Sequence, residues 1–430
     1  MRNCLIIQSY LIILCLLNTP SFARDWSEPL VIHQDGTGLQ LAHNPRGAIG
    51  VDSRGRVHMV YEITDDVSSP PDNQCWYRIL VNGQVSDPLR IDSGPYGGGR
   101  HPMLALDSQD TVHAVWQDYR HTTALGKWID NIEIYYDRKP ADGAFMDADI
   151  RVSHTGADHA GDNGYVPRAA VDSRDRIHIV WYDFTANGSR ADIYWRASDE
   201  QGLFPDHAGI EQFKITSFES GDTFDSYWLP DLAVLPDDSL YVVWGFLRGF
   251  TGIFQLQGRR ITPNGLLEPV EIIAEKGGRH SDPPRLAADR FGNLGLAYVS
   301  RPGNLYQIQF QYCPAGGAWS NPLTVNDGAL DSTQPNLAFD STGRVWIAWQ
   351  EDLGEQNQIR LAALNPAVGY IESSEVVSGG FEDARTPALA VHPAMDQIHL
   401  LWLRREDEEH RSLVYRYSLE TGVRGWMWHR

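Results

Sequence analysis

One sequence pattern recurs along the chain and limits its possible folds more than any other feature. Each copy runs from a proline through small and apolar residues to an anchor position, then through a tight turn into an alternating apolar strand that ends on an aromatic residue. In the first copy, Gly47 stands in place of the proline. The seven anchors stand at positions 52, 107, 172, 235, 289, 340 and 392, so successive anchors are 51 to 65 residues apart. The strands that follow them are Val57–Tyr61, Val112–Trp116, Ile177–Trp181, Leu240–Trp244, Leu294–Tyr298, Val345–Trp349 and Ile398–Trp402.

This period is typical of a four-stranded propeller blade with variable loops. A fourth strand begins at Ser86 and at Ser320, and the same phrase opens the chain at Ser27–Ile32, whereas the last copy lacks it. We therefore expect an all-β, seven-bladed β-propeller with four antiparallel strands per blade, whose ring closes when the N-terminal strand joins the C-terminal blade. Third strands are recognisable at Ile132–Asp137, Asp192–Ala197, Gln307–Tyr312, Ile359–Leu364 and Leu413–Tyr417.

The N-terminus has the features of an export signal. Arg2 supplies a positive charge, Cys4–Leu17 is largely apolar, and Ser21–Ala23 places small residues before a cleavage site. The apolar run is too short to span a membrane. We expect residues 1–23 to be a signal peptide, residues 24–430 to form a single propeller domain, and the mature protein to be secreted or periplasmic without membrane insertion.

The charge balance narrows the range of partners. A formal net charge of −20 argues against unspecific binding to nucleic acid or to an anionic membrane. It leaves room for an anionic polysaccharide, because a local basic pocket can bind an anion on an acidic protein. We expect a monomer. Two cysteines remain after the signal, Cys75 and Cys313, and they either pair in an oxidising compartment or stay as two separate thiols.

Chemistry is expected at one end of the central channel. The loop before the first strand and the loop after the second strand of each blade open on the same end, which we call the mouth. Blade 2 is richest in reactive side chains there, since Arg100 and His101 enter its first strand while Tyr119, Arg120 and His121 leave its second. The other candidates at the mouth are Tyr165, Arg190, Tyr227, Trp228, Arg248 and His280.

Four further histidines have a different interpretation. His58, His113, His178 and His399 occupy one repeated position in the second strand of their blades. A position that repeats around a ring favours a structural role, and we expect packing or an inter-blade hydrogen bond there rather than catalysis.

Histidine, tyrosine and arginine without an obvious carboxylate pair suit β-elimination on a uronic acid polysaccharide. An Arg or His would neutralise the sugar carboxylate, a His or Tyr would remove the C5 proton, and a Tyr or His would protonate the leaving oxygen. On these residues the chain resembles propeller polysaccharide lyases of the ulvan lyase type, within the broader sialidase-like propellers. The resemblance implies that His101 and His121 act with one tyrosine, Tyr165 or Tyr227, and one arginine, Arg190 or Arg248. Arg100, Tyr119, Arg120, Trp228 and His280 would then bind substrate.

Other functions stay open. The chain can be a non-catalytic propeller that binds carbohydrate or protein through its mouth aromatics, or a structural propeller of an envelope assembly. A sialidase-like glycosidase needs two carboxyl groups across a cleft, and nothing in the sequence pairs the available ones, Asp118, Asp183, Glu351 and Asp352. No cofactor is expected. Weaker alternatives are structural calcium at Asp158, Asp162 and Asn163, or zinc held by histidines near the mouth.

Overall fold

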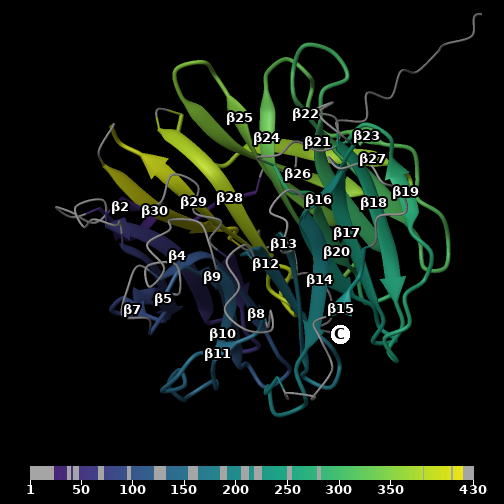
Figure 1. Ribbon diagram of the computed structural model, residues 1–430. Helices are drawn as coiled ribbons and strands as arrows, with labels where there is room; N and C mark the ends of the chain where they lie inside the picture. The colour runs from purple at the N-terminus through teal and green to yellow at the C-terminus, as the bar shows by residue number, and fades with distance from the viewer. Residues whose placement is uncertain are drawn as a thin grey trace, which may run out of the picture.

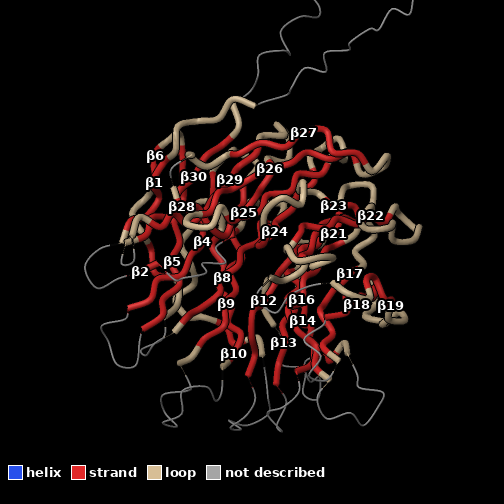
Figure 2. The backbone as a smooth tube through the Cα atoms, turned by 90° about the horizontal axis from the view of Figure 1, so that it is seen from above, coloured by secondary structure: helices blue, strands red, loops and turns tan. Residues whose placement is uncertain are grey.

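The computed structural model describes residues 24–35, 40–41, 48–65, 72–93, 98–120, 132–153, 163–184, 191–204, 213–216, 225–248, 254–277, 282–380, 382–407 and 410–419. These residues form strands, turns and loops, with no helix among them (Figure 2). Neither the proposed signal peptide nor His121, Arg190 and His280 lie within the described residues.

Seven antiparallel sheets make up the described part of the chain (Figure 1). The innermost strands are β3 (Ala48–Val51), β8 (Gly99–Leu106), β12 (Asn163–Val171), β16 (Ser226–Val234), β20 (Arg285–Ala288), β24 (Ser332–Phe339) and β28 (Asp383–Val391). The second strands are β4 (Val57–Asp65), β9 (Val112–Asp118), β13 (Ile177–Phe184), β17 (Leu240–Leu247), β21 (Leu294–Ser300), β25 (Val345–Asp352) and β29 (Ile398–Arg405).

The outer half of each sheet completes the blades. The third strands are β5 (Asp72–Val81), β10 (Glu133–Lys139), β14 (Ala191–Ala197), β18 (Phe254–Ile261), β22 (Gln307–Cys313), β26 (Asn357–Asn365) and β30 (Arg411–Tyr417). The outermost strands are β6 (Gln84–Val85), β7 (Leu89–Arg90), β11 (Ile150–Arg151), β15 (Phe213–Lys214), β19 (Glu271–Ala274), β23 (Leu323–Thr324), β27 (Tyr370–Val376) and β1 (Leu30–Gln34). The short β2 (Gln40–Leu41) also pairs with β4.

The ring closes through the N-terminal strand, as the sequence predicts. β1 pairs antiparallel with β30, so that Leu30 faces Tyr415 and Gln34 faces Ser412. Each innermost strand lies against the next one around the ring, and β28 lies against β3. The seven-bladed propeller is therefore confirmed, with the N-terminal strand forming the outer edge of blade 7.

The core lies between the blades. The aromatic residue that closes each second strand is fully or almost fully buried, as at Trp116, Trp181 and Trp244. Burial of a tryptophan side chain stabilises the fold by roughly 4–6 kcal/mol. One apolar cluster joins Val60 and Cys75 of blade 1 to Leu104 and Trp116 of blade 2, which shows how neighbouring blades share a core. Both faces of a second strand are covered, so that every residue of β9, for example, is buried.

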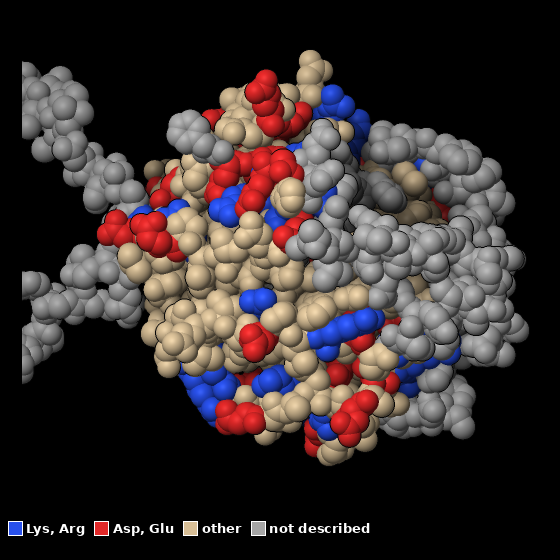
Figure 3. Space-filling view, turned by 90° about the vertical axis from the view of Figure 1, so that its left-hand side faces the viewer, with Lys and Arg blue, Asp and Glu red and all other residues tan. Residues whose placement is uncertain are grey.

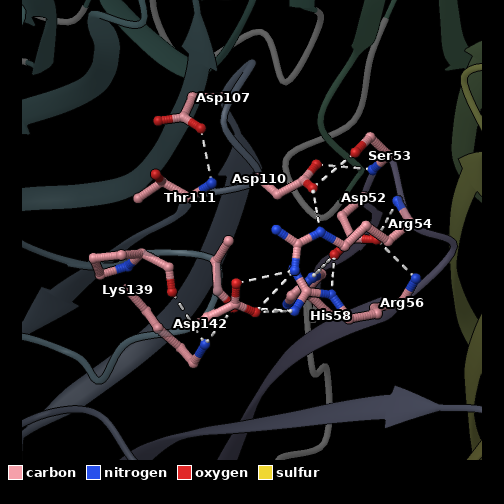
Figure 4. Close-up of polar contacts among 12 residues, drawn as sticks. Asp52, Ser53, Arg54, Arg56, His58, Asp107, Asp110, Thr111, Lys139 and Asp142 are labelled. Carbon is pink, nitrogen blue, oxygen red and sulfur yellow. Dashed lines mark hydrogen bonds and ion pairs between the residues drawn. The ribbon is translucent and has the colours of Figure 1, made fainter.

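The turns between first and second strands, at 52–56, 107–111, 172–176, 235–239, 289–293, 340–344 and 392–397, form the end of the propeller that we call the turn face. Blades are clamped to one another there: Ser53 donates from its amide and its hydroxyl to Asp110 of the next blade, at 2.8 and 2.7 Å (Figure 4). The same two bonds join Ser108 to Asp175, Ser173 to Asp238, and Ser341 to Asp396.

The residue that receives this clamp has a left-handed backbone. Asp110 has φ of 62°, and Asp175, Asp238 and Asp396 have φ between 54° and 62°. In the other three blades the same position holds a glycine, Gly55, Gly292 or Gly343. Glycine and aspartate tolerate this conformation better than most residues, and only aspartate also offers the two oxygens that the serine needs.

The four repeated histidines are buried and hydrogen-bonded, as the structural interpretation expects. His58 Nε2 lies 3.2 Å from Asp52 Oδ2 and His58 Nδ1 lies 2.7 Å from Tyr77 Oη. His113 has the corresponding partners Asp107 and Tyr136. These partners belong to the same blade as the histidine, so the prediction of an inter-blade hydrogen bond is wrong for these residues. A histidine in the second strand faces the anchor of its own turn because the two positions are hairpin neighbours.

Cys75 and Cys313 are both free thiols. Cys75 is buried between blades 1 and 2, whereas Cys313 lies at the end of β22 in blade 5. Of the two alternatives that the sequence left open, the structure therefore has separate thiols.

On the face shown in Figure 3, acidic and basic side chains lie interspersed.

Candidate functional site

The mouth is the end of the channel opposite the turn face, where innermost strands begin and second strands end. Near this end the innermost strand of five blades carries a register shift relative to the second strand. One residue in each shift has a positive φ of 48° to 54°: His101, Val166, Leu229, Gln334 and Thr386. His101 is thus placed by a bulge that the fold repeats, whatever the side chain.

The residue before each bulge pairs with the second strand and differs chemically from blade to blade. It is arginine in blade 2, tyrosine in blade 3, tryptophan in blade 4, threonine in blade 6 and arginine in blade 7: Arg100, Tyr165, Trp228, Thr333 and Arg385. All five are partly exposed. The mouth therefore presents a cation and two aromatic rings side by side on blades 2 to 4.

A buried carboxylate holds the cationic part of this site. Glu62 Oε1 accepts a hydrogen bond from Arg100 Nε at 2.8 Å, and Glu62 Oε2 accepts one from the His101 amide at 3.0 Å. His101 Nδ1 lies 4.0 Å from the same oxygen. The Glu62 side chain is 1% exposed while that of Arg100 is 38% exposed, so the pair connects the interior to the mouth. Burial lowers the pKa of Arg100, but Glu62 and Tyr119 more than offset this, and the guanidinium stays charged.

Tyr119 lies beside Arg100. The Arg100 guanidinium carbon is 6.0 Å from the centroid of the Tyr119 ring, and Gln117 Nε2 donates to Tyr119 Oη at 2.9 Å. Burial raises the pKa of the phenol, and the opposing attraction of Arg100 does not reverse this. The hydroxyl is therefore protonated near neutral pH and suited to donate a proton rather than accept one.

An aromatic cluster continues the site across blades 3 and 4. Tyr165 stacks on Tyr182 at a centroid distance of 5.3 Å, and Trp228 lies 5.2 Å from Tyr182 and 5.1 Å from Phe184. Flat rings at a channel mouth are suited to sugar rings as well as to other apolar faces.

The structure thus brings Arg100, His101 and Tyr119 together around Glu62, and groups Tyr165 with Trp228 in the aromatic cluster. Tyr227 is 8% exposed and packs against Trp244 and Phe246 of its own blade, within the buried cluster that also includes Tyr182. Arg248 is exposed just after β17.

Arg120 binds two carboxylates of its own blade. Its Nη2 donates to Asp118 at 2.7 Å and to Asp149 at 2.6 Å, and its guanidinium lies 3.8 Å from the Tyr135 ring centroid. The side chain is only 14% exposed, and these two carboxylates balance its charge within the blade.

Glu62 is the residue that sequence reasoning missed. It directly follows the closing aromatic Tyr61 of the second strand, where blades 2 and 6 have Gln117 and Gln350. When the seven repeat sequences are aligned, Glu62 is the acidic residue at a position that is uncharged in the other six. The sequence alone does not show that this side chain reaches the next blade.

Metal and membrane features can be assessed only in the described residues. No group of three or more histidine, cysteine, aspartate or glutamate side chains is placed there to hold a metal ion. Asp158 and Asp162 of the alternative calcium site, like His280, lie outside the described residues. No helix of the described part is long and apolar enough to cross a membrane.

Neither a protein-family model nor a curated protein matches the sequence. Solved structures do resemble it. A PL25 ulvan lyase bound to -[GlcA(1-4)Rha3S]- has a TM-score of 0.58 at 11% identity, covering 90% of this chain and 95% of its own. An α-L-arabinanase from Penicillium chrysogenum has a TM-score of 0.54 at 13% identity, covering 92% and 99%. An α-L-arabinofuranosidase from Fusarium graminearum has a TM-score of 0.55 at 12% identity, covering 79% and 98%. The propeller of this chain is thus one that polysaccharide lyases and glycoside hydrolases also use, and at these identities the likeness concerns the fold.

Proposed function

We propose that this chain is an exported polysaccharide lyase that cleaves a uronic-acid-containing polysaccharide, of the ulvan kind, by β-elimination. The observation that carries the proposal is the Glu62–Arg100–His101–Tyr119 cluster, which places a charged guanidinium, an imidazole and a protonated phenol within one blade of the mouth. The likeness to an ulvan lyase bound to a glucuronate-containing ligand supports the same substrate class.

The proposed chemistry needs three tasks from these residues. Arg100 pairs with the uronate carboxylate and stabilises the negative charge that develops there when the C5 proton leaves. His101, with His121, accepts that proton, the electron pair forms the C4–C5 double bond, and the C4–O bond breaks. A phenol, Tyr119 or Tyr165, returns a proton to the leaving oxygen. Placement favours these two tyrosines over Tyr227, which faces the core of blade 4.

Ultraviolet absorbance of the unsaturated product tests the proposal. The purified chain is incubated with a panel of uronate polysaccharides that includes ulvan, and we expect absorbance to rise on at least one of them. His101→Gln should lower the rate about 10²–10⁴-fold, the usual contribution of a general base. Val166→Ala is the matched control, since Val166 occupies the same bulge in blade 3 and should leave the rate unchanged. A flat trace on every uronate, from folded protein, would contradict the lyase.

A binding propeller is the second candidate, and the aromatic cluster of Tyr165, Tyr182 and Trp228 favours it. Such a protein should retain an oligosaccharide without turning it over. Its affinity should fall with Trp228→Ala and stay the same with His101→Gln, as measured by calorimetry.

A further inference from the structure

At the mouth, the second strands of three blades make the same hydrogen bond to the bulge of the next blade. Gln117 Oε1 accepts from the Val166 amide at 2.9 Å, and Gln350 Oε1 accepts from the Thr386 amide at 3.2 Å. Glu62 Oε2 accepts from the His101 amide at 3.0 Å. In each case the side chain after the closing aromatic reaches the bulge of the next blade. A neutral amide is sufficient for this bond, so the bond does not explain a carboxylate at position 62.

The second oxygen of Glu62 has a partner that the glutamines lack. It binds Arg100 Nε at 2.8 Å across the boundary between blades 1 and 2. Arg385 occupies the position of Arg100 in blade 7, yet its guanidinium binds Asp383, two residues earlier in its own strand, with Nη2–Oδ2 of 2.8 Å. A carboxylate that is 1% exposed is costly to keep charged without a cation beside it. The charge at position 62 is thus matched to Arg100.

We propose that Glu62 is a positioning residue for the mouth: it fixes the guanidinium of Arg100 so that a uronate carboxylate meets it already oriented. This inference rests on the proposed function of the same site. With Nε held by Glu62 and Tyr119 also hydrogen-bonded to the guanidinium, the plane of the Arg100 fork is fixed, and its remaining N–H groups need no reorientation when charge develops on a carboxylate during elimination.

Glu62 should have opposite effects on binding and on rate. Its negative charge lies close to the site of the incoming carboxylate, so it weakens binding of the ground state. Its orientation of Arg100 matters most when charge develops during elimination, and a misplaced group can cost about 10²-fold in rate. A residue that only joined two blades would produce neither effect.

The discriminating variant is Glu62→Gln, because glutamine is what blades 2 and 6 use for the bulge bond. The amide should keep the bond to the His101 backbone and lose the ion pair with Arg100. We expect kcat on the uronate polymer to fall about 10²-fold, KM to fall, and the melting temperature to stay near that of the wild type. Gln350→Glu is the reciprocal control, since it makes the opposite change of charge at the same position of blade 6, away from Arg100.

A double-mutant cycle with Arg100→Ala separates positioning from a general loss of structure. If Glu62 acts through Arg100, Glu62→Gln should have no further effect on kcat once Arg100 is absent. Additive losses, an unchanged kcat in the single variant, or a large fall in melting temperature would each overturn the inference.

Calorimetric binding of free glucuronate, with glucose as the neutral comparison, needs no turnover. We expect Glu62→Gln to bind glucuronate several-fold more tightly, with the gain lost in the Arg100→Ala background and glucose unaffected. Equal glucuronate affinity in wild type and Glu62→Gln would overturn the inference even if the enzyme is active. A wild type that eliminates no uronate polymer contradicts the proposed function instead, so the two failures are distinguishable.

Discussion

Both ends of the propeller contain residues with a left-handed backbone, but the two ends differ in which side chains occupy them. At the turn face each blade has a left-handed residue, and in four blades it is an aspartate clamped by the serine of the blade before. At the mouth five blades again have a left-handed residue, but it is His, Val, Leu, Gln or Thr. Repetition of backbone and side chain together marks a structural device. Repetition of the backbone alone leaves the side chains free for a function that one blade can carry.

Arg100→Ala should produce the largest difference between the two ends. Loss of a preorganised cation at a developing negative charge typically costs about 10²–10³-fold in rate, so kcat on the uronate polymer should fall by that factor. The melting temperature should fall as well, because the variant leaves the buried carboxylate of Glu62 without its cation, so activity is compared per folded molecule. Arg385→Ala, at the same position of blade 7, is the matched control and should keep its activity. Equal losses in both variants would mean that mouth arginines act through the fold, which would break the comparison.

Asp110 tests the turn face. Asp110→Ala removes two hydrogen bonds from Ser53 and leaves a Cβ at φ of 62° without the short polar side chain that tolerates this conformation. We therefore expect a loss of about 2–4 kcal/mol in the free energy of unfolding. Asp110→Gly removes the same bonds without the backbone cost, as in blades 1, 5 and 6, and should lose about 1 kcal/mol less. Chemical denaturation measures both variants. Activity per folded molecule should be unchanged, and a large loss of activity would show that the two ends are not independent.

The repeat predicted the turn face better than the mouth. The anchors, the closing aromatics and the order of strands follow from short-range patterns, because an apolar run bounded by a turn forms a hairpin within one blade. The outermost strands are harder to locate, since several are only two residues long, such as β11 and β23. Their partners and solvent exposure, rather than their own residues, decide where they end.

The mouth depends on contacts between blades, which a single sequence does not record. His101 lies next to a proline and carries no sign of its positive φ. The position of Arg120 after a second strand predicts a side chain open to a ligand, but its guanidinium binds Asp118 and also Asp149, 29 residues later in the same blade. Glu62 reaches a bulge in the following blade. The candidate residues could be found from their types, whereas their grouping required the structure.

His399 gives a smaller, pH-dependent test of the turn-face pattern. His58, His113 and His178 each have an aspartate at the anchor, but blade 7 has His392 there. Burial, with a further contribution from His392, lowers the pKa of His399 to about 3, and the ring contacts Tyr415 Oη at 2.6 Å. In the unfolded chain His399 takes up a proton near pH 6.5, whereas in the folded chain it stays neutral until the pH approaches 3. Stability is therefore lost as pH falls from about 6.5 toward 3, by up to about 1.4 kcal/mol per unit.

His392→Asp should restore the anchor of the other blades and reduce this loss. A carboxylate near His399 raises the pKa of the imidazole toward its unfolded value. Between pH 7 and pH 4 the variant should lose about 1–2 kcal/mol less stability than the wild type, as measured by denaturation at both pH values. Parallel pH profiles for the two proteins would show that another group, such as His33 with a pKa of about 4, controls the acid limit.

Asp142→Ala should have the smallest effect. Asp142 binds Arg54 at 2.9 Å and Arg56 at 3.0 Å beside the Ser53–Asp110 clamp, as Figure 4 shows, yet its side chain is 70% exposed. Exposed pairs are screened by water and salt and lose side-chain entropy on forming. We therefore expect a melting temperature indistinguishable from that of the wild type in physiological salt, although the ion pairs are similar in distance to the bonds of the Ser53–Asp110 clamp. A salt-dependent loss as large as that of Asp110→Gly would mean that surface charge, rather than the serine–aspartate bonds, joins blades 1 and 2. The turn face would then resemble the mouth in depending on charges particular to one blade.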